Sequence, residues 1–157
     1  MATKYDDASW HYEGDYPSDL TEIHASTHIG MFVQWCIEND LISTFLQQEF
    51  PHGIEQVKSN TLTGAAFLHH HCDGKFTDED LNALGNAFAA DYYNESDFGE
   101  DVANYIDDYL DVFDENAENK GWVYETLYHI EDTPANYQLL KPVIDERFQQ
   151  WKLYRGV

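Results

Sequence analysis

The apolar residues of this chain recur at helical spacing, in short segments separated by glycine, proline, asparagine and aspartate. In the segment 99–113 the apolar side chains follow one another at intervals of four, three and four residues: Val102, Ile106, Tyr109 and Phe113. This period matches the 3.6 residues per turn of an α-helix rather than the alternation of a strand. A chain built from such segments is expected to fold by packing helices against one another.

The same pattern predicts the positions of the other helices. We predict helices over Ser26–Asn39, Leu41–Phe50, Thr63–Cys72, Leu81–Tyr92 and Gly99–Phe113, further turns in Ile54–Asn60, and a helix that starts at Asp132-Thr133-Pro134. Pro142 either kinks that last helix or begins a new one. Thr77 and Asp80 form a weak capping box. In Trp122–Ile130 the helix and strand patterns compete.

These segments predict a mainly α-helical fold. At 157 residues the chain is expected to be one domain, a bundle of six to eight short-to-medium helices. Residues 1–20 contain Gly14, Pro17 and the aspartate pair Asp6-Asp7, and we expect them to form a loop or short extended segments that pack on the core. This region leaves room for a small β element at the N-terminus.

The charge of the chain is strongly one-sided. There are 30 acidic against 8 basic side chains, for a formal net charge of −22, and no lysine or arginine occurs between Lys75 and Lys120. Aromatic residues make up 15% of the chain, which disordered acidic tails lack, so the charge is expected on a folded surface. Such a surface repels nucleic acids and anionic membranes and favours basic proteins or cations as partners.

Two further features bear on the compartment. The first ten residues lack the apolar core of a signal peptide, and no apolar run approaches the ~20 residues of a membrane span. The two cysteines, Cys36 and Cys72, have no C-x-x-C spacing. We therefore expect a cytoplasmic protein with reduced thiols, the alternative being a single disulfide between the two.

The acidic residues between 97 and 118 are the first candidate site. Several recur along one side of the predicted helix, where like charges destabilise it unless a cation is near. We interpret this side as a docking surface for a basic protein; its predicted residues are Asp97, Glu100, Asp101, Asp107, Asp108, Asp111, Asp114, Glu115 and Glu118, with Tyr93 and Tyr105 as anchors. The alternatives are a solvated helix face or a generally acidic surface. A generally acidic surface would spread the charge evenly, yet residues 121–157 hold 5 acidic and 4 basic side chains.

A calcium loop is the second candidate. The residues Asp73 to Asp80 match the second half of an EF-hand, with Gly74 as the turn glycine and Asp80 at the last position. The first half does not match, because His69 and His71 stand where calcium requires oxygen ligands. In the alternative interpretation, Asp73-Gly74 ends one helix and Thr77 caps the next.

Histidines form the third candidate. His24 and His28 lie one helical turn apart, a spacing that suits two ligands of one metal, with Glu22 or one of His69 to His71 as the third. The alternative for His28 is a capping or hydrogen-bonded histidine of the core.

Catalytic motifs are not found in the sequence. There is no G-x-S-x-G, no P-loop and no dinucleotide-binding glycine pattern. The adjacent carboxylates Asp6-Asp7 and Asp107-Asp108 are poor acid–base pairs, because neighbours on a helix point about 100° apart. We therefore expect no enzymatic activity and no cofactor, with an enzyme of unrecognised type as a further alternative.

Two N-terminal motifs are similar to motifs of known proteins. They are Lys4-Tyr5-Asp6-Asp7-Ala8-Ser9-Trp10-His11-Tyr12, followed by Gly14-Asp15-Tyr16-Pro17, and Thr27-His28-Ile29-Gly30-Met31-Phe32 with Trp35 one turn later. Together with Cys72-Asp73-Gly74-Lys75 and Thr77-Asp78-Glu79-Asp80-Leu81, they resemble an uncharacterised family of small bacterial proteins. The similarity covers most of residues 4–113.

Proteins that look like this are often encoded near secreted polymorphic toxins, including those of contact-dependent and type VI systems. The resemblance therefore implies an immunity protein that binds and neutralises a cognate toxin domain. It assigns no role to individual residues. The motif residues Asp6, Asp7, Trp10, His11 and His28 are equally compatible with a structural role, in which the N-terminal segment is fixed over the first long helix.

Overall fold

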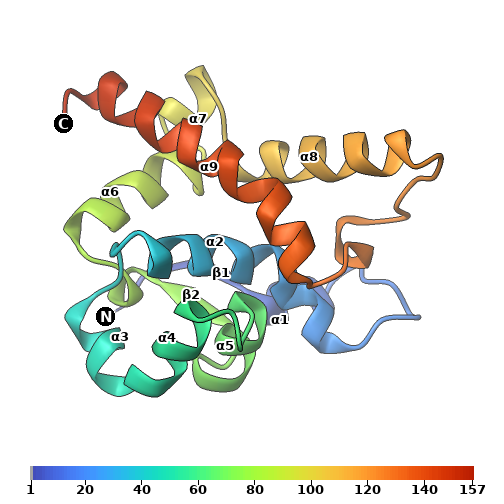
Figure 1. The fold of residues 1–157 in the computed structure, drawn as a ribbon, viewed down its shortest axis with the longest axis horizontal. Helices are drawn as coiled ribbons and strands as arrows, with labels where there is room; N and C mark the ends of the chain where they lie inside the picture. Colours follow the sequence, from blue (N-terminus) through green and yellow to red (C-terminus); the bar gives the residue numbers. More distant parts are fainter. Residues whose placement is uncertain (1) are drawn as a thin grey trace.

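The computed structural model describes residues 2–157 and is mainly helical (Figure 1). The α-helices are α1 Ala8–Tyr12, α2 Thr27–Glu38, α3 Thr44–Glu49, α4 Pro51–Lys58, α5 Gly64–His71, α6 Ala83–Tyr92, α7 Phe98–Asp101, α8 Tyr105–Asn119 and α9 Pro134–Arg155. Short 3₁₀ turns occupy Glu22–Ser26, Asp78–Asp80 and Leu127–His129. The strands β1 Lys4–Asp7 and β2 Lys75–Thr77 form a small antiparallel sheet. The predicted mainly α fold with a small N-terminal β element is thus confirmed.

Helix α2 forms the centre of the core. Every residue from Thr27 to Ile37 is buried, so this helix is covered on all sides rather than along one stripe. Helices α4, α5 and α9 pack against it, and α5 does so most extensively. In Figure 1, α9 crosses over α2 on its way back toward α6.

Helices α2 and α5 approach each other through two glycines. A Cβ atom built on Gly30 would lie 2.2 Å from the Cα of Ala65, and one built on Gly64 would lie 2.0 Å from the carbonyl oxygen of Gly30. The backbones are therefore in direct contact at this crossing. Side-chain oxygen Oε1 of Gln34 accepts a hydrogen bond from the Gly64 amide at 3.1 Å, which fixes the register of the two helices.

The small sheet fastens the N-terminus to the middle of the chain. Asp6 of β1 faces Phe76 of β2, and Asp7 faces Lys75. Beyond the strand, Asp7 caps helix α1, because its carboxylate accepts a hydrogen bond from the Ser9 amide at 3.0 Å. The sequence pattern does not predict helix α1 and favours a loop or extended segments there. A helix of only five residues that begins at a side-chain cap leaves little periodicity to detect.

Two predicted helices have different boundaries. The helix predicted over Leu41–Phe50 begins only at Thr44, because Ile42 is extended and bridges Leu81. The single helix predicted over Gly99–Phe113 is wrong: α7 ends at Asp101, and α8 starts at Tyr105. Asn104 causes this break by capping α8, with its side chain accepting a hydrogen bond from the Asp107 amide at 3.0 Å.

The predicted capping box at Thr77 is confirmed. Its hydroxyl accepts a hydrogen bond from the Glu79 amide at 3.2 Å, and the Thr77 amide donates to Oδ2 of Asp80 at 2.8 Å. Burial, assisted by the charges of Glu79 and Asp78, raises the pKa of Asp80 to about 6 despite these bonds. The Asp80 carboxyl therefore binds its proton more tightly in the folded than in the unfolded chain.

This shift predicts how substitution of Asp80 depends on pH. The stability that a raised carboxyl pKa contributes is complete below the unfolded value of about 3.9 and is lost as the pH rises through 6. An asparagine side chain at this position keeps the acceptor without the charge. We therefore expect Asp80→Asn to raise the free energy of unfolding by roughly 1–3 kcal/mol at pH 7.5. At pH 4 the difference should be small.

Urea denaturation followed by tryptophan fluorescence at both pH values measures this difference. Glu49→Gln, at an exposed carboxylate on α3, is the control and should change stability little at either pH. An equal effect of Asp80→Asn at pH 4 and pH 7.5 would contradict the assignment.

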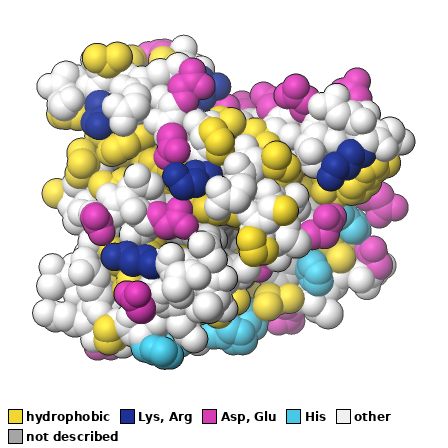
Figure 2. All heavy atoms as spheres, in the orientation of Figure 1, with side chains coloured by type: hydrophobic (Ala, Val, Ile, Leu, Met, Phe, Trp, Pro, Cys, Tyr) yellow, Lys and Arg dark blue, Asp and Glu magenta, His cyan; other side chains and the backbone are white. Residues whose placement is uncertain are grey.

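Helix α9 supplies cations to the acidic part of the chain. It begins at Pro134, within the predicted start Asp132-Thr133-Pro134, is capped by Thr133, and continues through Pro142 to Arg155. Arg147 pairs with Asp108 at 2.9 Å, and Arg155 pairs with Asp91 at 2.7 Å. Figure 2 shows the lysine and arginine side chains of this face as isolated groups, whereas acidic side chains follow the edge formed by α8.

No helix formed by residues 2–157 combines the length and the apolar character that crossing a bilayer requires. Cys36 is buried in the core and Cys72 is half-buried, and both thiols are free, so the alternative of a disulfide is wrong for this structure.

Candidate functional site

The two N-terminal motifs meet in space. Asp6 comes from β1, His11 from α1 and His28 from the first turn of α2. Their side-chain ligand atoms all lie within 4.8 Å of one another. We refer to these three residues as the His–Asp cluster.

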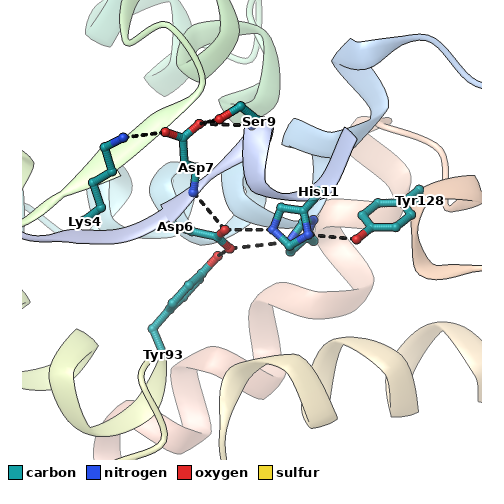
Figure 3. Close-up of polar contacts among 8 residues, drawn as sticks. Lys4, Asp6, Asp7, Ser9, His11, Tyr93 and Tyr128 are labelled. Atoms are coloured by element: carbon teal, nitrogen blue, oxygen red, sulfur yellow. Dashed lines mark hydrogen bonds and ion pairs between the residues drawn. The ribbon is translucent and has the colours of Figure 1, made fainter. Parts of the chain in front are cut away.

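Asp6 is the centre of the cluster (Figure 3). Its Oδ1 accepts a hydrogen bond from the Asp7 amide at 2.8 Å and lies 2.7 Å from Nε2 of His11. Its Oδ2 accepts the hydroxyl proton of Tyr93 at 2.5 Å and lies 3.5 Å from Nε2 of His28. Asp6 is 8% exposed, so these contacts replace nearly all of its hydration.

The electrostatics of the cluster keep Asp6 ionised. Burial alone would raise the pKa of Asp6, but hydrogen bonding to His11 and Tyr93 and the nearby imidazole of His28 together lower it well below its usual range. The reverse holds for the phenol. Burial and the Asp6 carboxylate raise the pKa of Tyr93 well above 10, so Tyr93 remains a hydrogen-bond donor.

His28 is the most deeply buried member, with 3% of its surface exposed. Burial lowers the pKa of His28 although Asp6 favours its charged form. Its Nδ1 has no hydrogen-bond partner among the described residues. Its backbone carbonyl accepts a hydrogen bond from the Tyr105 hydroxyl at 2.5 Å, which fixes the start of α2 against α8.

His11 occupies the accessible side of the cluster. Its Nδ1 lies 2.7 Å from the hydroxyl of Tyr128, and its ring packs edge-on against that of His28 at 4.7 Å between centroids. A cavity of about 220 Å³ opens beside the cluster. It is lined by Tyr5, Asp6, Trp10, His11, His28, Tyr93, Tyr105 and Ile106. An ionised carboxylate and two imidazoles facing a cavity can hold a cation or transfer a proton.

A second acidic and histidine group lies at the surface. His129 is 3.0 Å from Asp19 and 3.5 Å from Glu125. Both carboxylates are largely exposed, and Asp19 has its pKa lowered by the hydrogen bond from His129. Exposed pairs of this kind contribute little stability, because solvent screens their charges.

The predicted metal pair of His24 and His28 is not formed. His24 belongs to the 3₁₀ turn that precedes α2, and its Nδ1 lies 3.2 Å from the Thr21 hydroxyl. Within residues 2–157, His28 gathers with Asp6 and His11 rather than with His24, Glu22 or the exposed His69 to His71.

The calcium-loop candidate, whose alternative is a helix end followed by a cap, gathers no group of three His, Cys, Asp or Glu ligands within residues 2–157. Lys75–Thr77 is strand β2, and Asp80 is engaged in the capping box. Asp73 adopts a positive φ of 54° directly after α5 and pairs with Lys75 at 3.0 Å. The alternative interpretation, a helix end followed by a cap, is the one that the structure adopts.

The predicted docking residues do not share one environment. Asp108 is 5% exposed and binds Arg147, because it lies three residues after the buried Tyr105 and so on the inner face of α8. Tyr105 is 1% exposed, and the hydroxyl of the half-buried Tyr93 is bound to Asp6. The anchor role predicted for these tyrosines is therefore wrong, since they are packed inside the protein.

Helix α7 and its flanks carry the other paired acids. Asp97 lies 3.0 Å from Arg155, and Asp101 accepts a hydrogen bond from the Tyr154 hydroxyl at 2.9 Å. Both remain exposed, as does Glu100. These residues belong to a separate helix from the acids of α8, so the expected single continuous face does not exist.

The remaining acids form one exposed stripe along α8. Its members are Asp107, Asp111, Asp114, Glu115 and Glu118. They recur at the i, i+4, i+7, i+8 and i+11 positions of one helix face. None of the ion pairs formed within residues 2–157 involves them. We call this set the acidic stripe.

The sequence pattern alone does not identify the His–Asp cluster as a site. It presents Asp6 and His11 only as parts of a motif, and it pairs His28 with the wrong histidine. The usable signal is the co-occurrence of the two N-terminal motifs, because both supply members of the cluster. The partners Arg147 and Arg155 give no local signal.

Comparisons with known proteins give one family. The model of a domain of unknown function, DUF7832, matches residues 4–125. Neither the curated proteins nor the solved structures contain a match. The matched range includes β1, α1, α2 and all of α8, and therefore both the His–Asp cluster and the acidic stripe. It covers well over half of the chain, so the protein belongs to the family defined by the DUF7832 domain, a domain of unknown function.

Proposed function

We propose that this protein is a cytoplasmic immunity protein, which binds and neutralises a secreted bacterial toxin domain of the contact-dependent or type VI kind. The observation that carries the proposal is the acidic stripe. Its five carboxylates are exposed on one face of α8, while the acids nearer α9 are paired with arginines. The resemblance to proteins encoded near toxin genes supports the same function.

A basic cleft is the partner chemistry that fits this stripe. Toxin domains that act on nucleic acids or nucleotides bind phosphates, and carboxylates at helical spacing can occupy phosphate positions. Uncompensated like charges on one face destabilise the helix in isolation, and a cationic partner removes that cost. Complementary fields also raise association rates toward ~10⁸–10⁹ M⁻¹s⁻¹ at low salt.

Apolar anchors flank the stripe. Val102 is half-exposed before α8 begins, and Trp122 and Val123 are exposed just after it ends. Affinity in protein interfaces depends on such desolvated side chains more than on rim charges. These three residues therefore take the anchor role that the sequence pattern suggests for Tyr93 and Tyr105.

A hollow beside the stripe suits a cationic side chain. It has a volume of about 210 Å³ and lies between α8 and the segment that follows it. Asp114 and Glu125 both contribute to its lining, with Leu110, Tyr124 and Leu127 as apolar walls. An arginine or lysine of a partner would place its apolar stem against these walls and its charge near the carboxylates.

Charge reversal tests the proposal. The gene neighbourhood is inspected for a large secreted protein with a toxin-like C-terminal domain, and that domain is the probe. We expect the wild-type protein to rescue cells that express this domain. Reversal of three stripe residues, Asp111→Lys, Asp114→Lys and Glu118→Lys, is expected to abolish rescue. It should also slow association by at least about tenfold at low salt, because steering charges act mainly on the on-rate.

The matched control reverses three exposed acids elsewhere. Glu49→Lys, Glu55→Lys and Glu79→Lys lie on or near α3 and α4 and change the net charge by the same amount. This variant should still rescue and should bind with nearly wild-type kinetics. If both triple variants lose binding equally, total charge rather than the stripe is responsible. If neither variant changes binding or its salt dependence, the electrostatic part of the proposal is wrong.

A further inference from the structure

The His–Asp cluster has the composition of a metal site. It offers one carboxylate and two imidazoles from three different elements, which the sheet and α2 hold together. Two histidines and one carboxylate form the ligand set of many zinc and non-haem iron sites. The cluster does not depend on the acidic stripe, which lies on the outer face of α8.

The separations within the cluster fit a shared ion. Two ligands bound to one tetrahedral zinc ion at about 2.1 Å lie about 3.4 Å apart. Nε2 of His28 lies 3.5 Å from Oδ2 of Asp6, which is long for a hydrogen bond and close to this value. Nε2 of His11 lies 2.7 Å from Oδ1 of Asp6, a distance typical of a shared proton that an ion would replace.

The surrounding hydrogen bonds hold the ligands as metal sites require. Metal-binding histidines usually donate their second ring nitrogen to an oxygen, and ligating carboxylates are themselves hydrogen-bonded. Nδ1 of His11 faces the Tyr128 hydroxyl at 2.7 Å, and Asp6 accepts hydrogen bonds from the Asp7 amide and from Tyr93. Figure 3 shows Tyr93 and Tyr128 on opposite sides of this group.

His28 supplies an independent observation. Its ring is almost fully buried, yet Nδ1 has no partner among the described residues, and Nε2 has only the distant carboxylate of Asp6. A purely structural histidine in the core would be expected to satisfy both nitrogens. An ion bound at Nε2 would give that nitrogen the close partner it lacks, whereas Nδ1 stays without a partner among the described residues.

The cavity leaves room for a further ligand. Its volume of about 220 Å³ exceeds that of a water molecule several times over, and its lining includes all three cluster residues. Trp10, which is 55% exposed, forms part of the wall on the solvent side. Three protein ligands with an open position facing a cavity are the pattern of a catalytic rather than a closed structural zinc site.

From this geometry we infer that Asp6, His11 and His28 bind a divalent transition-metal ion, zinc being the simplest candidate, with an exchangeable ligand facing the cavity. The carboxylate and the two Nε2 atoms are the protein ligands. Tyr93 and Tyr128 are positioning residues, which orient Asp6 and His11 without touching the ion.

Metal titration of the full chain tests this inference. The protein is stripped with a chelator and titrated with zinc chloride in a calorimeter, and separately with cobalt(II), whose visible absorption reports tetrahedral coordination. We expect one equivalent to bind at micromolar or lower concentration and to raise the thermal unfolding temperature. His11→Gln and Asp6→Asn are each expected to weaken metal binding at least about a hundredfold. Loss of a hydrogen bond to a ligand already lowers metal affinity by about 10–100-fold, and loss of the ligand itself should lower it at least as much.

Two controls exclude other histidines. The triple variant His69→Gln, His70→Gln, His71→Gln removes the exposed histidines at the end of α5, and His129→Gln removes the surface group with Asp19 and Glu125. Both variants should bind one equivalent as the wild type does. Circular dichroism of the two cluster variants verifies that they remain folded. His11→Gln is the more tolerant of the two, because His11 is only half-buried.

Three results would overturn the inference. The first is a wild-type protein that binds neither zinc nor cobalt at millimolar concentration. The second is unchanged binding by folded His11→Gln and Asp6→Asn proteins. The third is loss of the bound equivalent in either control variant. Failure here would leave the proposed docking function intact, since the toxin-rescue experiment does not involve the cluster.

Discussion

Alanine at Gly30 is expected to destabilise the folded protein by about 3 kcal/mol or more, the upper end of overpacking effects. The added Cβ would lie 2.2 Å from both the Cα and the amide nitrogen of Ala65. These are backbone atoms of α5 and cannot rotate away, so α2 and α5 would have to separate. Because α2 is buried along nearly its whole length, that separation would disturb the core on every side.

The matched control is Gly53→Ala in α4. The nearest atoms to a Cβ there belong to the side chains of His71 and Phe67, at 3.0 and 3.1 Å, and alanine gains about 1 kcal/mol in helix propensity over glycine. We therefore expect Gly53→Ala to change stability by no more than about 1 kcal/mol. Urea unfolding of both variants, followed by tryptophan fluorescence, measures the difference. Similar stabilities for the two variants would show that the α2–α5 crossing can relax.

Removal of the Asp108 carboxylate is expected to have the second largest effect, a loss of about 3 kcal/mol in Asp108→Ala. Asp108 accepts two hydrogen bonds from Arg147, at 2.9 and 3.1 Å, and one from the buried Tyr92 hydroxyl at 2.6 Å. Its loss leaves the buried Tyr92 phenol without its acceptor and deprives the partly buried Arg147 of its carboxylate partner. It also releases a contact between α8 and α9.

Asp111→Ala is the control, one helical turn later on the same helix. Asp111 is exposed and belongs to the acidic stripe, so its loss should change the free energy of unfolding by no more than about 0.5 kcal/mol. A double-mutant cycle of Asp108→Ala with Arg147→Ala isolates the pair itself. Equal effects of Asp108→Ala and Asp111→Ala would contradict the distinction between paired and unpaired acids.

The difference between the acids that pair with arginines of α9 and those of the acidic stripe bears on function. Arg147 and Arg155 bind the carboxylates that face α9, so those charges stabilise the fold. The acidic stripe has no such partner among the described residues and is the part of the charge that remains for a second molecule. A variant that removes an arginine of α9 would therefore affect stability, whereas reversal of the stripe would affect recognition.

The helices can be predicted because their signals are local. The period of apolar residues locates α2, α5 and α6 to within one or two residues, and Thr133-Pro134 marks the start of α9 as expected. Thr77 caps the 3₁₀ turn Asp78–Asp80, which precedes α6. The failures are also local. A side-chain cap at Asn104 divides a predicted helix in two, and a strand-like pairing of Ile42 delays the start of α3.

The site is harder to predict, because its members are far apart in the sequence. Asp6 and His28 are separated by 22 residues, and Asp6 and Tyr93 by 87. Their meeting depends on the pairing of β1 with β2 and on the close crossing of α2 and α5. Spacing along one helix suggests His24 instead, which lies in the preceding 3₁₀ turn.

The sequence by itself determined the mainly helical architecture, the capping box at Thr77 and the total charge of −22, because these depend on composition and on neighbours within a turn or two. Only the tertiary structure decided which acids are paired by α9, which form the acidic stripe, and which carboxylate lies between two histidines. The physical reason is that burial and charge pairing arise between elements. Aspartate therefore has a structural role at position 108, where it is buried, and is an exposed surface charge at position 111.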